Sequence, residues 1–262
     1  MRLGFDLDGT LADMHSALVL EARRLFPDID PAAVPNSTAP DEPTGPQDQD
    51  ADPKADAAEE SLSIGALTAR QQRELWKAVR ERENFWESLD EIEPGALARL
   101  HALVQSRRWE LIFLTSRPET AGDTAQAQSH RWLSAHGYPD PSVFVVHGSR
   151  GKIAAALHLD VLVDDRPENC LDVAIDSTAR GILVWRGDTG KVPASARHLG
   201  IGAVNSMKEC LDILEELDRS SGEPGMLDRL KRLLGLKPAN ARFNKPGRPG
   251  SESADDRVSS VG

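Results

Sequence analysis

Two aspartates spaced two residues apart follow a short apolar run at the start of the chain, in the stretch Arg2-Leu3-Gly4-Phe5-Asp6-Leu7-Asp8-Gly9-Thr10-Leu11. If the apolar run is a buried strand, Asp6 and Asp8 lie at its carboxyl end, where open α/β sheets place their ligands. Burying two carboxylates side by side is costly unless a cation or a shared proton compensates. The pair therefore predicts a metal, a basic partner or exposure to solvent. The plain alternative is that Asp8-Gly9 forms a turn and Asp6 caps a helix.

Three further groups of polar residues occur where apolar segments end or the next helix begins. They are Thr115-Ser116-Arg117, Lys152 and Asp164-Asp165. Because the carboxyl ends of parallel strands meet at one edge of a sheet, we expect all of these groups to lie near Asp6 and Asp8. The turn alternative for Asp8-Gly9 does not explain this convergence.

The side chains expected at this edge suit phosphoryl transfer. Its four carboxylates are those of Asp6, Asp8, Asp164 and Asp165. Together they would hold a hard divalent cation, for which Mg²⁺ with oxygen ligands and retained waters is the natural choice. Lys152 supplies a positive counterpart, and the hydroxyl and backbone N–H groups of Thr115 and Ser116 can hold phosphoryl oxygens. An aimed, ionised Asp6 would then attack phosphorus, and hydrolysis would follow.

The elements that position these groups alternate between strands and helices. Beyond the first strand, apolar runs predict strands over 109–114, 143–146, 161–163 and 181–185. Helical spacing of apolar residues predicts helices over 14–26, 68–82, 97–104, 125–136, 152–157 and 207–217. This alternation predicts an α/β, Rossmann-like fold in which helices cover both faces of a mostly parallel sheet, giving three layers.

Two segments have compositions that do not support a packed structure. Residues 31–61 are rich in proline and acidic side chains, and the last part of the chain is rich in Pro, Gly, Ser and charge. Such segments bury too little apolar surface to offset their ordering entropy. We therefore predict a disordered acidic insertion at about 31–61, and a basic helix with a disordered tail over 220–262.

Composition excludes several classes of function. The 262 residues carry a formal net charge of −11, which argues against binding of duplex nucleic acid through a broad basic face. The only cysteines, Cys170 and Cys210, support neither a disulfide framework nor a cysteine zinc site. We find no apolar run long enough to span a bilayer and no signal-peptide pattern, so we expect a cytoplasmic protein with no membrane partner. Composition and motif spacing do not indicate an oligomeric state.

Taken in order, the four polar groups resemble the four motifs of the haloacid dehalogenase superfamily of Mg²⁺-dependent phosphohydrolases. The resemblance covers roughly residues 1–217 apart from the acidic insertion. It implies a catalytic core over 1–13 and 94–219 and a small helical cap over 14–93, which contains the acidic insertion. It implies that Asp6 attacks the phosphoryl group and that Asp8 protonates the leaving oxygen and later activates water. It also implies that the Asp8 carbonyl, Asp6 and an acidic residue of Asp164-Asp165 surround Mg²⁺, while Thr115 and Lys152 bind phosphate. An aspartate at position 8 favours phosphatase over dehalogenase chemistry.

Within this superfamily, the chain is similar to the deoxyribonucleotidase (5′-nucleotidase) branch. The similarity lies in Phe85-Trp86-Glu87-Ser88-Leu89, Pro94-Gly95-Ala96, Thr115-Ser116 and Asp164-Asp165-Arg166-Pro167. It implies that Phe85 and Trp86, from the cap, stack on a base and that the substrate is a small phosphorylated compound, a (deoxy)nucleoside 5′-monophosphate. Arg117, directly after Thr115-Ser116, departs from that branch and is a further candidate for substrate binding. From residues alone, the two aromatics serve equally well as core anchors.

Three alternatives remain open. The Asp-Asp-Arg motif and the pair Trp132-Leu133 are also similar to polynucleotide 3′-phosphatase domains. A small-metabolite phosphatase of the same superfamily would carry the same four motifs. A non-catalytic phosphate-binding or adaptor protein would keep the fold without turnover.

Overall fold

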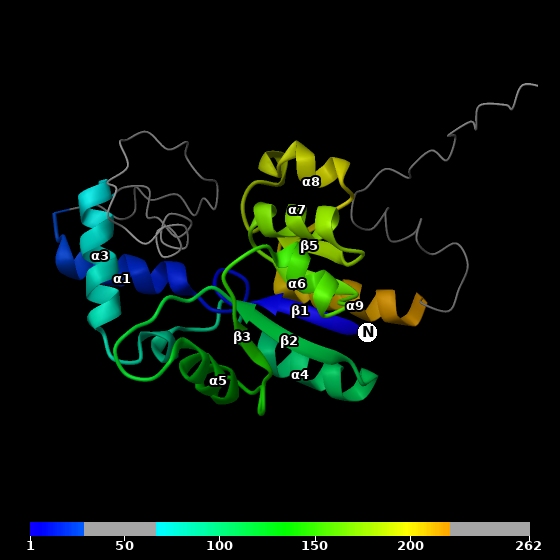
Figure 1. Ribbon diagram of the computed structural model, residues 1–262, viewed down its shortest axis with the longest axis horizontal. Coiled ribbons are helices and arrows are strands. Elements are labelled where there is room, and N and C mark those ends of the chain that lie inside the picture. Colours follow the sequence, from blue (N-terminus) through cyan, green and yellow to red (C-terminus); the bar gives the residue numbers. More distant parts are fainter. Residues whose placement is uncertain (29–66, 221–262) are drawn as a thin grey trace, which may run out of the picture.

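The computed structural model describes residues 1–28 and 67–220, whose elements alternate between strands and helices (Figure 1). The strands are β1 (Arg2–Asp6), β2 (Glu110–Thr115), β3 (Val143–Val145), β4 (Val161–Asp164), β5 (Arg180–Val184) and β6 (Gly202–Val204). The helices are α1 (Met14–Leu25), α3 (Ala69–Glu81), α4 (Ala96–Arg107), α5 (Ala125–Ala135), α6 (Arg150–Ala156), α7 (Pro167–Asp176), α8 (Ala194–His198) and α9 (Met207–Ser220). Two short 3₁₀ helices are η2 (Phe85–Ser88) and η3 (Thr189–Lys191).

The strands of the described residues form one parallel sheet in the order β3-β2-β1-β4-β5-β6. β1 lies between β2 and β4, so that Leu3 is in register with both Leu111 and Val161. The chain winds toward β3 on one side of β1 and toward β6 on the other. The carboxyl end of β1 is therefore a topological switch point, the place where open α/β sheets bind ligands.

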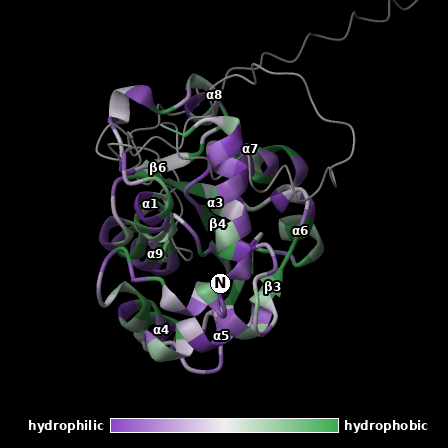
Figure 2. Ribbon diagram, turned by 90° about the vertical axis from the view of Figure 1, so that its left-hand side faces the viewer, coloured by the Kyte–Doolittle hydropathy of each residue, from purple (hydrophilic) through white to green (hydrophobic). Residues whose placement is uncertain are grey.

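Alternate side chains of the strands point into cores on opposite faces of the sheet. Val161 and Val163 of β4 pack in one cluster with residues of α4 and α9, whereas Leu162 between them packs in a second cluster with Ala154 of α6 and Val173 of α7. Figure 2 shows the mainly hydrophobic strands enclosed by helices that carry many hydrophilic residues. The predicted α/β fold with helices on both faces is confirmed.

Local signals explain where several helices begin. Thr68 and Gln71 form the predicted capping box, in which each side chain bonds the backbone of the other residue, and α3 begins directly after Thr68. Pro167 opens α7, where its missing N–H costs no helical hydrogen bond. The sequence reasoning did not predict α7, β6 or α8. α8 has five residues and β6 has three, too few to show a periodicity.

The region between β1 and α4 contains the elements of the predicted cap. α1 and α3 pack against each other to one side of the sheet, and η2 packs against α5 (Figure 1). The chain passes to and from this region through two paired segments, because Ile92 donates its N–H to the Leu11 carbonyl and Asp13 donates its N–H to the Asp90 carbonyl. The predicted acidic insertion at about 31–61 and the predicted basic tail at 220–262 lie outside the described residues, apart from Ser220 at the end of α9.

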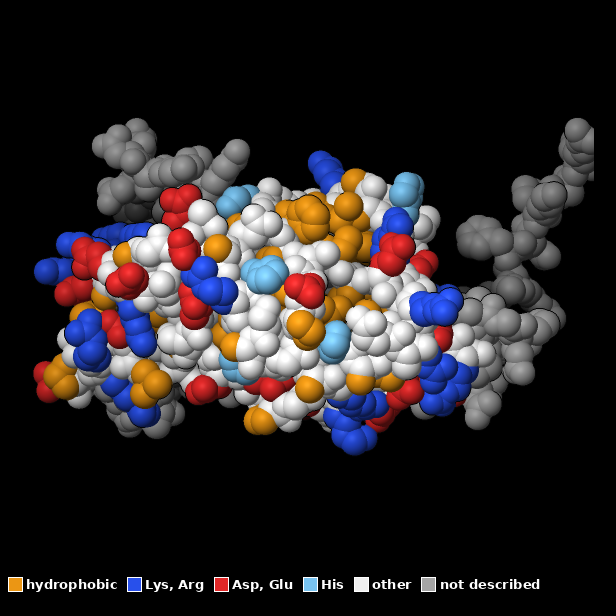
Figure 3. Space-filling model, turned by 90° about the horizontal axis from the view of Figure 1, so that it is seen from below, with side chains coloured by type: hydrophobic (Ala, Val, Ile, Leu, Met, Phe, Trp, Pro, Cys, Tyr) orange, Lys and Arg blue, Asp and Glu red, His pale blue; other side chains and the backbone are white. Residues whose placement is uncertain are grey.

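Acidic and basic side chains are interspersed on the surface seen in Figure 3. The described residues include exposed ion pairs, such as those of Arg131 on α5 with Glu87 and Asp123. In residues 1–28 and 67–220 no helix is long and apolar enough to cross a membrane.

We predict that the Gly151→Ala substitution destabilises the fold by about 2 kcal/mol or more, because overpacking a close contact displaces backbone. A Cβ added at Gly151 of α6 would lie 2.0 Å from the Asp172 carbonyl oxygen of α7. Urea unfolding measures the loss. The matched control is Gly187→Ala, where the nearest atom to the new Cβ would be 3.4 Å away. Equal stability of the two variants would contradict this account of α6–α7 packing.

Candidate active site

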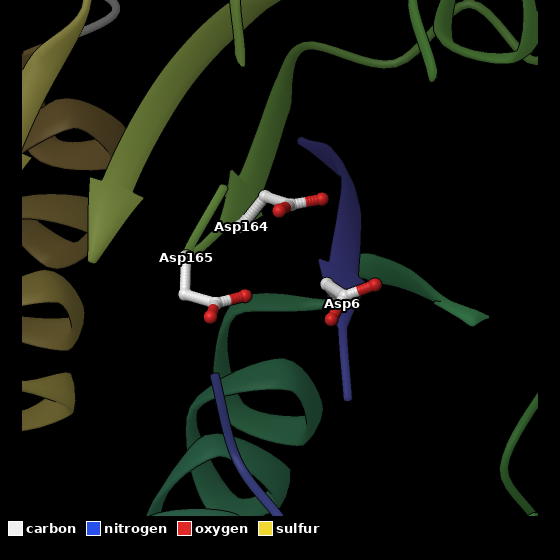
Figure 4. Close-up of side chains that lie close together, drawn as sticks. All are labelled: Asp6, Asp164 and Asp165. Atoms are coloured by element: carbon white, nitrogen blue, oxygen red, sulfur yellow. The ribbon is translucent and has the colours of Figure 1, made fainter. Parts of the chain in front are cut away.

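Three carboxylates converge where β1 and β4 end (Figure 4). Asp6 is the last residue of β1, Asp164 is the last residue of β4, and Asp165 follows it. The register pairs Phe5 with Val163, so the next residue of each strand, Asp6 and Asp164, lie side by side. One oxygen of each of the three carboxylates lies within 4.8 Å of the others, and all three residues are buried. The convergence predicted from the sequence is thus found for these residues.

Burial and mutual repulsion make these carboxyl groups weak acids. Burial raises the pKa of Asp6 well above its usual value, and the neighbouring carboxylates raise it further. Burial and the charge of Asp164 raise the pKa of Asp165 to about 8. Burial also raises the pKa of Asp164, although the Arg150 charge and the N–H groups of Arg166 and Asn169 oppose this shift. The group is short of positive charge.

A tight turn after β1 brings the next part of the chain against this cluster. Leu11 and Ala12 both donate their N–H groups to the Leu7 carbonyl at 2.8 Å. Gly9 has a φ of +82°, and a Cβ there would lie 2.1 Å from Asp165 Oδ2, so the turn requires glycine for conformation and for space. Asp8-Gly9 is therefore a turn, as the plain alternative held, and this turn is part of the site.

Arg150, and not Lys152, is the basic side chain beside the carboxylates. Arg150 is 3% exposed, and its Nη2 donates to Asp6 Oδ1 at 3.2 Å and to Ser116 Oγ at 2.9 Å. The Lys152 side chain is exposed on the surface of α6. Two residues along a helix rotate a side chain by about 200°, so both cannot face the site. The expectation that Lys152 lies there is corrected in favour of Arg150.

A helix-start signal could have identified Arg150. Ser149 caps α6 by accepting the N–H of Lys152, which makes Arg150 the first helical residue. Arg150 Nη1 donates to the carbonyl of Val146, directly after β3, at 3.5 Å. The Nε of Arg150 is buried without a hydrogen-bond partner. A buried donor without a hydrogen bond is costly, and here the nearest acceptor is Asp164 Oδ2, at the ion-pair distance of 3.9 Å.

Asp8 lies in the site but turns its carboxylate away from the three-aspartate cluster. It accepts hydrogen bonds from Thr115 Oγ1 at 3.2 Å and from the guanidinium of Arg117, whose Nη2 lies 2.7 Å from Asp8 Oδ1. Thr115 ends β2 and is buried, and Ser116 follows it. Of the residues predicted to ligate a metal through their side chains, Asp8 is the one outside the cluster.

Phe85 and Trp86 offer no surface for stacking. Both side chains are fully buried in η2, where their rings meet edge to face at 5.0 Å. Trp86 Nε1 donates to the Pro118 carbonyl at 3.0 Å. Arg117 is 2% exposed and is engaged with Asp8. These buried side chains act as anchors of the structure. Their placement does not favour contact with a substrate, which stays a prediction.

Arg186, which follows β5 after one residue, holds the turn from its other side. It donates to the Gly9 carbonyl, to the Thr10 carbonyl at 2.9 Å and to Glu93 Oε1 at 3.0 Å. Glu93 also accepts the N–H groups of Met207 and Lys208 at the start of α9. Sequence reasoning missed both residues, because neither stands in a motif and their contact joins positions 93 residues apart.

The donor set of the cluster fits a divalent cation. Asp6, Asp164 and Asp165 each offer a carboxylate oxygen, the ligand type that hard cations prefer. Their raised pKa values reflect the excess of negative charge that a cation would neutralise.

Comparison with solved structures identifies one that shares this arrangement of strands and helices. A haloacid dehalogenase family hydrolase from Deinococcus radiodurans R1, with bound phosphate and sodium, aligns with a TM-score of 0.50 and 15% identity over 82% of this chain and 95% of its own. The fold is haloacid dehalogenase-like. A putative β-phosphoglucomutase from Thermotoga maritima aligns with a TM-score of 0.48 and 19% identity, over 82% and 99% of the two chains. No protein-family model and no curated protein matches the sequence.

In the absence of divalent cations, we predict that stability falls as pH rises from about 4 to about 8. Asp165 has a pKa of about 8 in the folded chain against a usual 3.8, so over this range the folded state binds a proton that the unfolded state releases. The slope reaches at most about 1.4 kcal/mol per pH unit for one proton. Thermal unfolding in a chelator, with Asp165→Asn as the control that removes this titration, measures the effect. A wild-type pH dependence equal to that of Asp165→Asn would contradict it.

Proposed function

We propose that the protein is a Mg²⁺-dependent phosphomonoesterase that works through an aspartyl-phosphate on Asp6. The observation that carries this proposal is the buried cluster of Asp6, Asp164 and Asp165 with the Arg150 guanidinium against Asp6, at the switch point of a haloacid dehalogenase-like sheet. Carboxylates and a guanidinium at one point suit a phosphoryl group together with a cation.

Arg150 and Ser116 are the groups that would hold the phosphoryl oxygens. Arg150 already donates to Ser116 Oγ at 2.9 Å, so the two side chains form one polar surface next to Asp6. Guanidinium groups bind phosphate through charge-assisted hydrogen bonds. The Nε of Arg150 makes no hydrogen bond, although it lies 3.9 Å from Asp164 Oδ2, and it is a further donor for such a bond. Ser116 stays a predicted phosphate ligand, and Thr115 contributes by holding Asp8.

Asp6 and Asp8 have different surroundings that suit different roles. Asp6 lies within the carboxylate cluster, and an oxygen of Asp6 would attack phosphorus. Asp8 lies two residues away, held by Thr115 and Arg117, where it would protonate the leaving oxygen and then accept a proton from the attacking water. A Mg²⁺ ion bound by Asp6, Asp164 and Asp165 would neutralise charge and polarise the phosphoryl group.

The burial of Phe85 and Trp86 changes the substrate class that we propose. A (deoxy)nucleoside 5′-monophosphate was expected because Phe85 and Trp86 could stack on a base, but both side chains are fully buried. The reaction is therefore proposed without a base-stacking site, and a small phosphorylated compound is the substrate class that the site supports. Nucleotide substrates and 3′-phosphorylated oligonucleotides stay predictions from the sequence motifs.

We expect Asp6→Asn to reduce kcat roughly 10⁴-fold or more, because an amide oxygen is a poor nucleophile toward phosphorus. Phosphate release is measured with Mg²⁺ on a panel of 5′-nucleotides, sugar phosphates and 3′-phosphorylated oligonucleotides. Substitution of Asp6 also removes a like charge from the cluster, so the variant should fold and unfold at the wild-type temperature or above. Full activity of Asp6→Asn would exclude the aspartyl-phosphate.

The panel also separates this proposal from its alternatives. Hydrolysis that disappears in a chelator and returns with Mg²⁺ supports the phosphomonoesterase. If no panel member is hydrolysed but inorganic phosphate binds, the chain is a phosphate-binding protein that keeps the fold.

We predict that Arg150→Met weakens binding of inorganic phosphate by roughly 10- to 100-fold, whereas Lys152→Met changes it less than about twofold. Both substitutions remove one positive charge from α6, but only Arg150 contacts Asp6 and Ser116. Competitive inhibition by phosphate, or calorimetry in Mg²⁺, measures the affinity. A larger effect of Lys152→Met would show that Lys152, and not Arg150, binds the phosphate.

A further inference from the structure

Arg117 is a buried arginine whose three guanidinium nitrogens are all hydrogen-bonded. Its Nε donates to both oxygens of Asp8 at 3.0 and 2.9 Å, and its Nη2 donates to Asp8 Oδ1 at 2.7 Å. Its Nη1 donates to Ser129 Oγ on α5 at 2.9 Å. Such forked contact fixes both the position of the Asp8 carboxylate and the plane in which it lies.

Two tryptophans hold the guanidinium from its sides. The Cζ atom of Arg117 lies over the Trp86 ring at 5.0 Å and over the Trp132 ring at 5.7 Å, within the range of cation–π attraction. Each ring is itself fixed by its indole N–H, which reaches the Pro118 carbonyl from Trp86 and the Leu89 carbonyl from Trp132. The Phe-Trp motif therefore has a place in the site, although it has no exposed surface.

These contacts come from three separate parts of the chain. Trp86 belongs to η2 in the predicted cap region, whereas Trp132 and Ser129 belong to α5, and Arg117 follows β2. Trp86, Trp132 and Ser129 all contact Arg117, and Arg117 in turn bonds the carboxylate of Asp8, which lies outside the three-aspartate cluster. A buried assembly of this size around a single carboxylate indicates that its orientation is under tight control.

We propose that Arg117 is the positioning residue for Asp8 and that η2 and α5, through Trp86, Trp132 and Ser129, hold Arg117 in place for this purpose. The proposal rests on the proposed function, because it concerns the proton transfers assigned there to Asp8. It departs from the prediction that Arg117 binds substrate. Arg117 acts through Asp8 and contacts neither the phosphoryl group nor the leaving group.

Asp8 takes part in both halves of the proposed reaction. In the first half, an Asp6 oxygen forms a bond to phosphorus, the bond to the leaving oxygen breaks, and that oxygen takes a proton from Asp8. In the second half, water attacks phosphorus, its proton passes to Asp8, and the bond between phosphorus and Asp6 breaks to release phosphate. A misplaced Asp8 should slow the first half only when the leaving oxygen needs a proton, but should slow the second half for every substrate.

The experiment compares an alkyl phosphate with 2,4-dinitrophenyl phosphate, whose phenolate leaves without protonation. For Arg117→Met, kcat/KM should fall roughly 10²-fold on the alkyl ester and less than about threefold on the dinitrophenyl ester. With the dinitrophenyl ester, rapid mixing should show a burst of about one phenolate per active site, followed by turnover slowed roughly 10²-fold, because the Asp6 phosphoester accumulates.

Two milder variants keep the test valid if Arg117→Met does not fold. Arg117→Lys keeps the charge but loses the fork, and Ser129→Ala removes only the bond to Nη1. Both should show the same dependence on the leaving group, with smaller losses for Ser129→Ala. The control is Arg131→Met on the same helix, which loses exposed ion pairs with Glu87 and Asp123 and should match wild type on both esters.

A double substitution shows whether Arg117 acts through Asp8. In an Asp8→Asn background, Arg117→Met should reduce the remaining kcat/KM on the alkyl ester less than about twofold, because the two changes remove the same function. Independent, multiplying losses, or equal losses on the two esters without a burst, would overturn the proposal. If wild type hydrolyses neither ester, the proposed function has failed instead.

Discussion

The excess of negative charge at the end of the central strands is the constraint on which the site depends. Parallel pairing puts Asp6 and Asp164 side by side, and Asp165 joins them, so three buried carboxylates share one small volume. Burial raises the pKa of all three groups. Arg150 lies against this cluster, and a bound cation would neutralise the remaining negative charge. Asp8, only two residues from Asp6, has a separate cationic partner in Arg117.

That separation would allow the two neighbouring carboxylates, Asp6 and Asp8, to take the different roles proposed for them. Without it, Asp6 and Asp8, only two residues apart, would experience similar electrostatic surroundings. The turn after β1 and the fork of Arg117 rotate Asp8 away from the cluster and toward Thr115. Trp86 and Trp132, which hold Arg117 through their rings, thus contribute indirectly to the electrostatics of the site.

The fold was predictable from the sequence because apolar runs and helical spacing are local signals, and a parallel sheet then determines which strand ends meet. Asp6, Asp164 and Asp165 followed from that rule. The position of Lys152 was predicted wrongly, because the topology of a parallel sheet places the start of a helix near the site. It does not determine which of two basic residues on that helix faces inward. The N-cap at Ser149 makes Arg150 the first residue of α6, but this cap can be recognised only when the exact residue at which the helix begins is known.

The tertiary contacts were beyond sequence reasoning for a different reason. Phe85 and Trp86 are apolar, and only their burial distinguishes an anchor from a stacking surface. Arg117 carries a charge that suggests contact with a phosphate, yet its partner is an internal carboxylate. Arg186 and Glu93 belong to no motif, and their bonds depend on the packing of β5 and α9.

Through its contacts, Arg186 makes the folding of the site depend on segments late in the chain. The turn at Gly9 is held by a side chain 177 residues away, and Glu93, which shares that side chain, caps a helix 114 residues further along. Contacts of such long range form only after the intervening chain has been closed into place. During synthesis, strand β1 leaves the ribosome before the other described strands, yet the turn that follows it gains its last support only when β5 and α9 have emerged. The nascent chain would therefore carry its acidic residues long before it had a site.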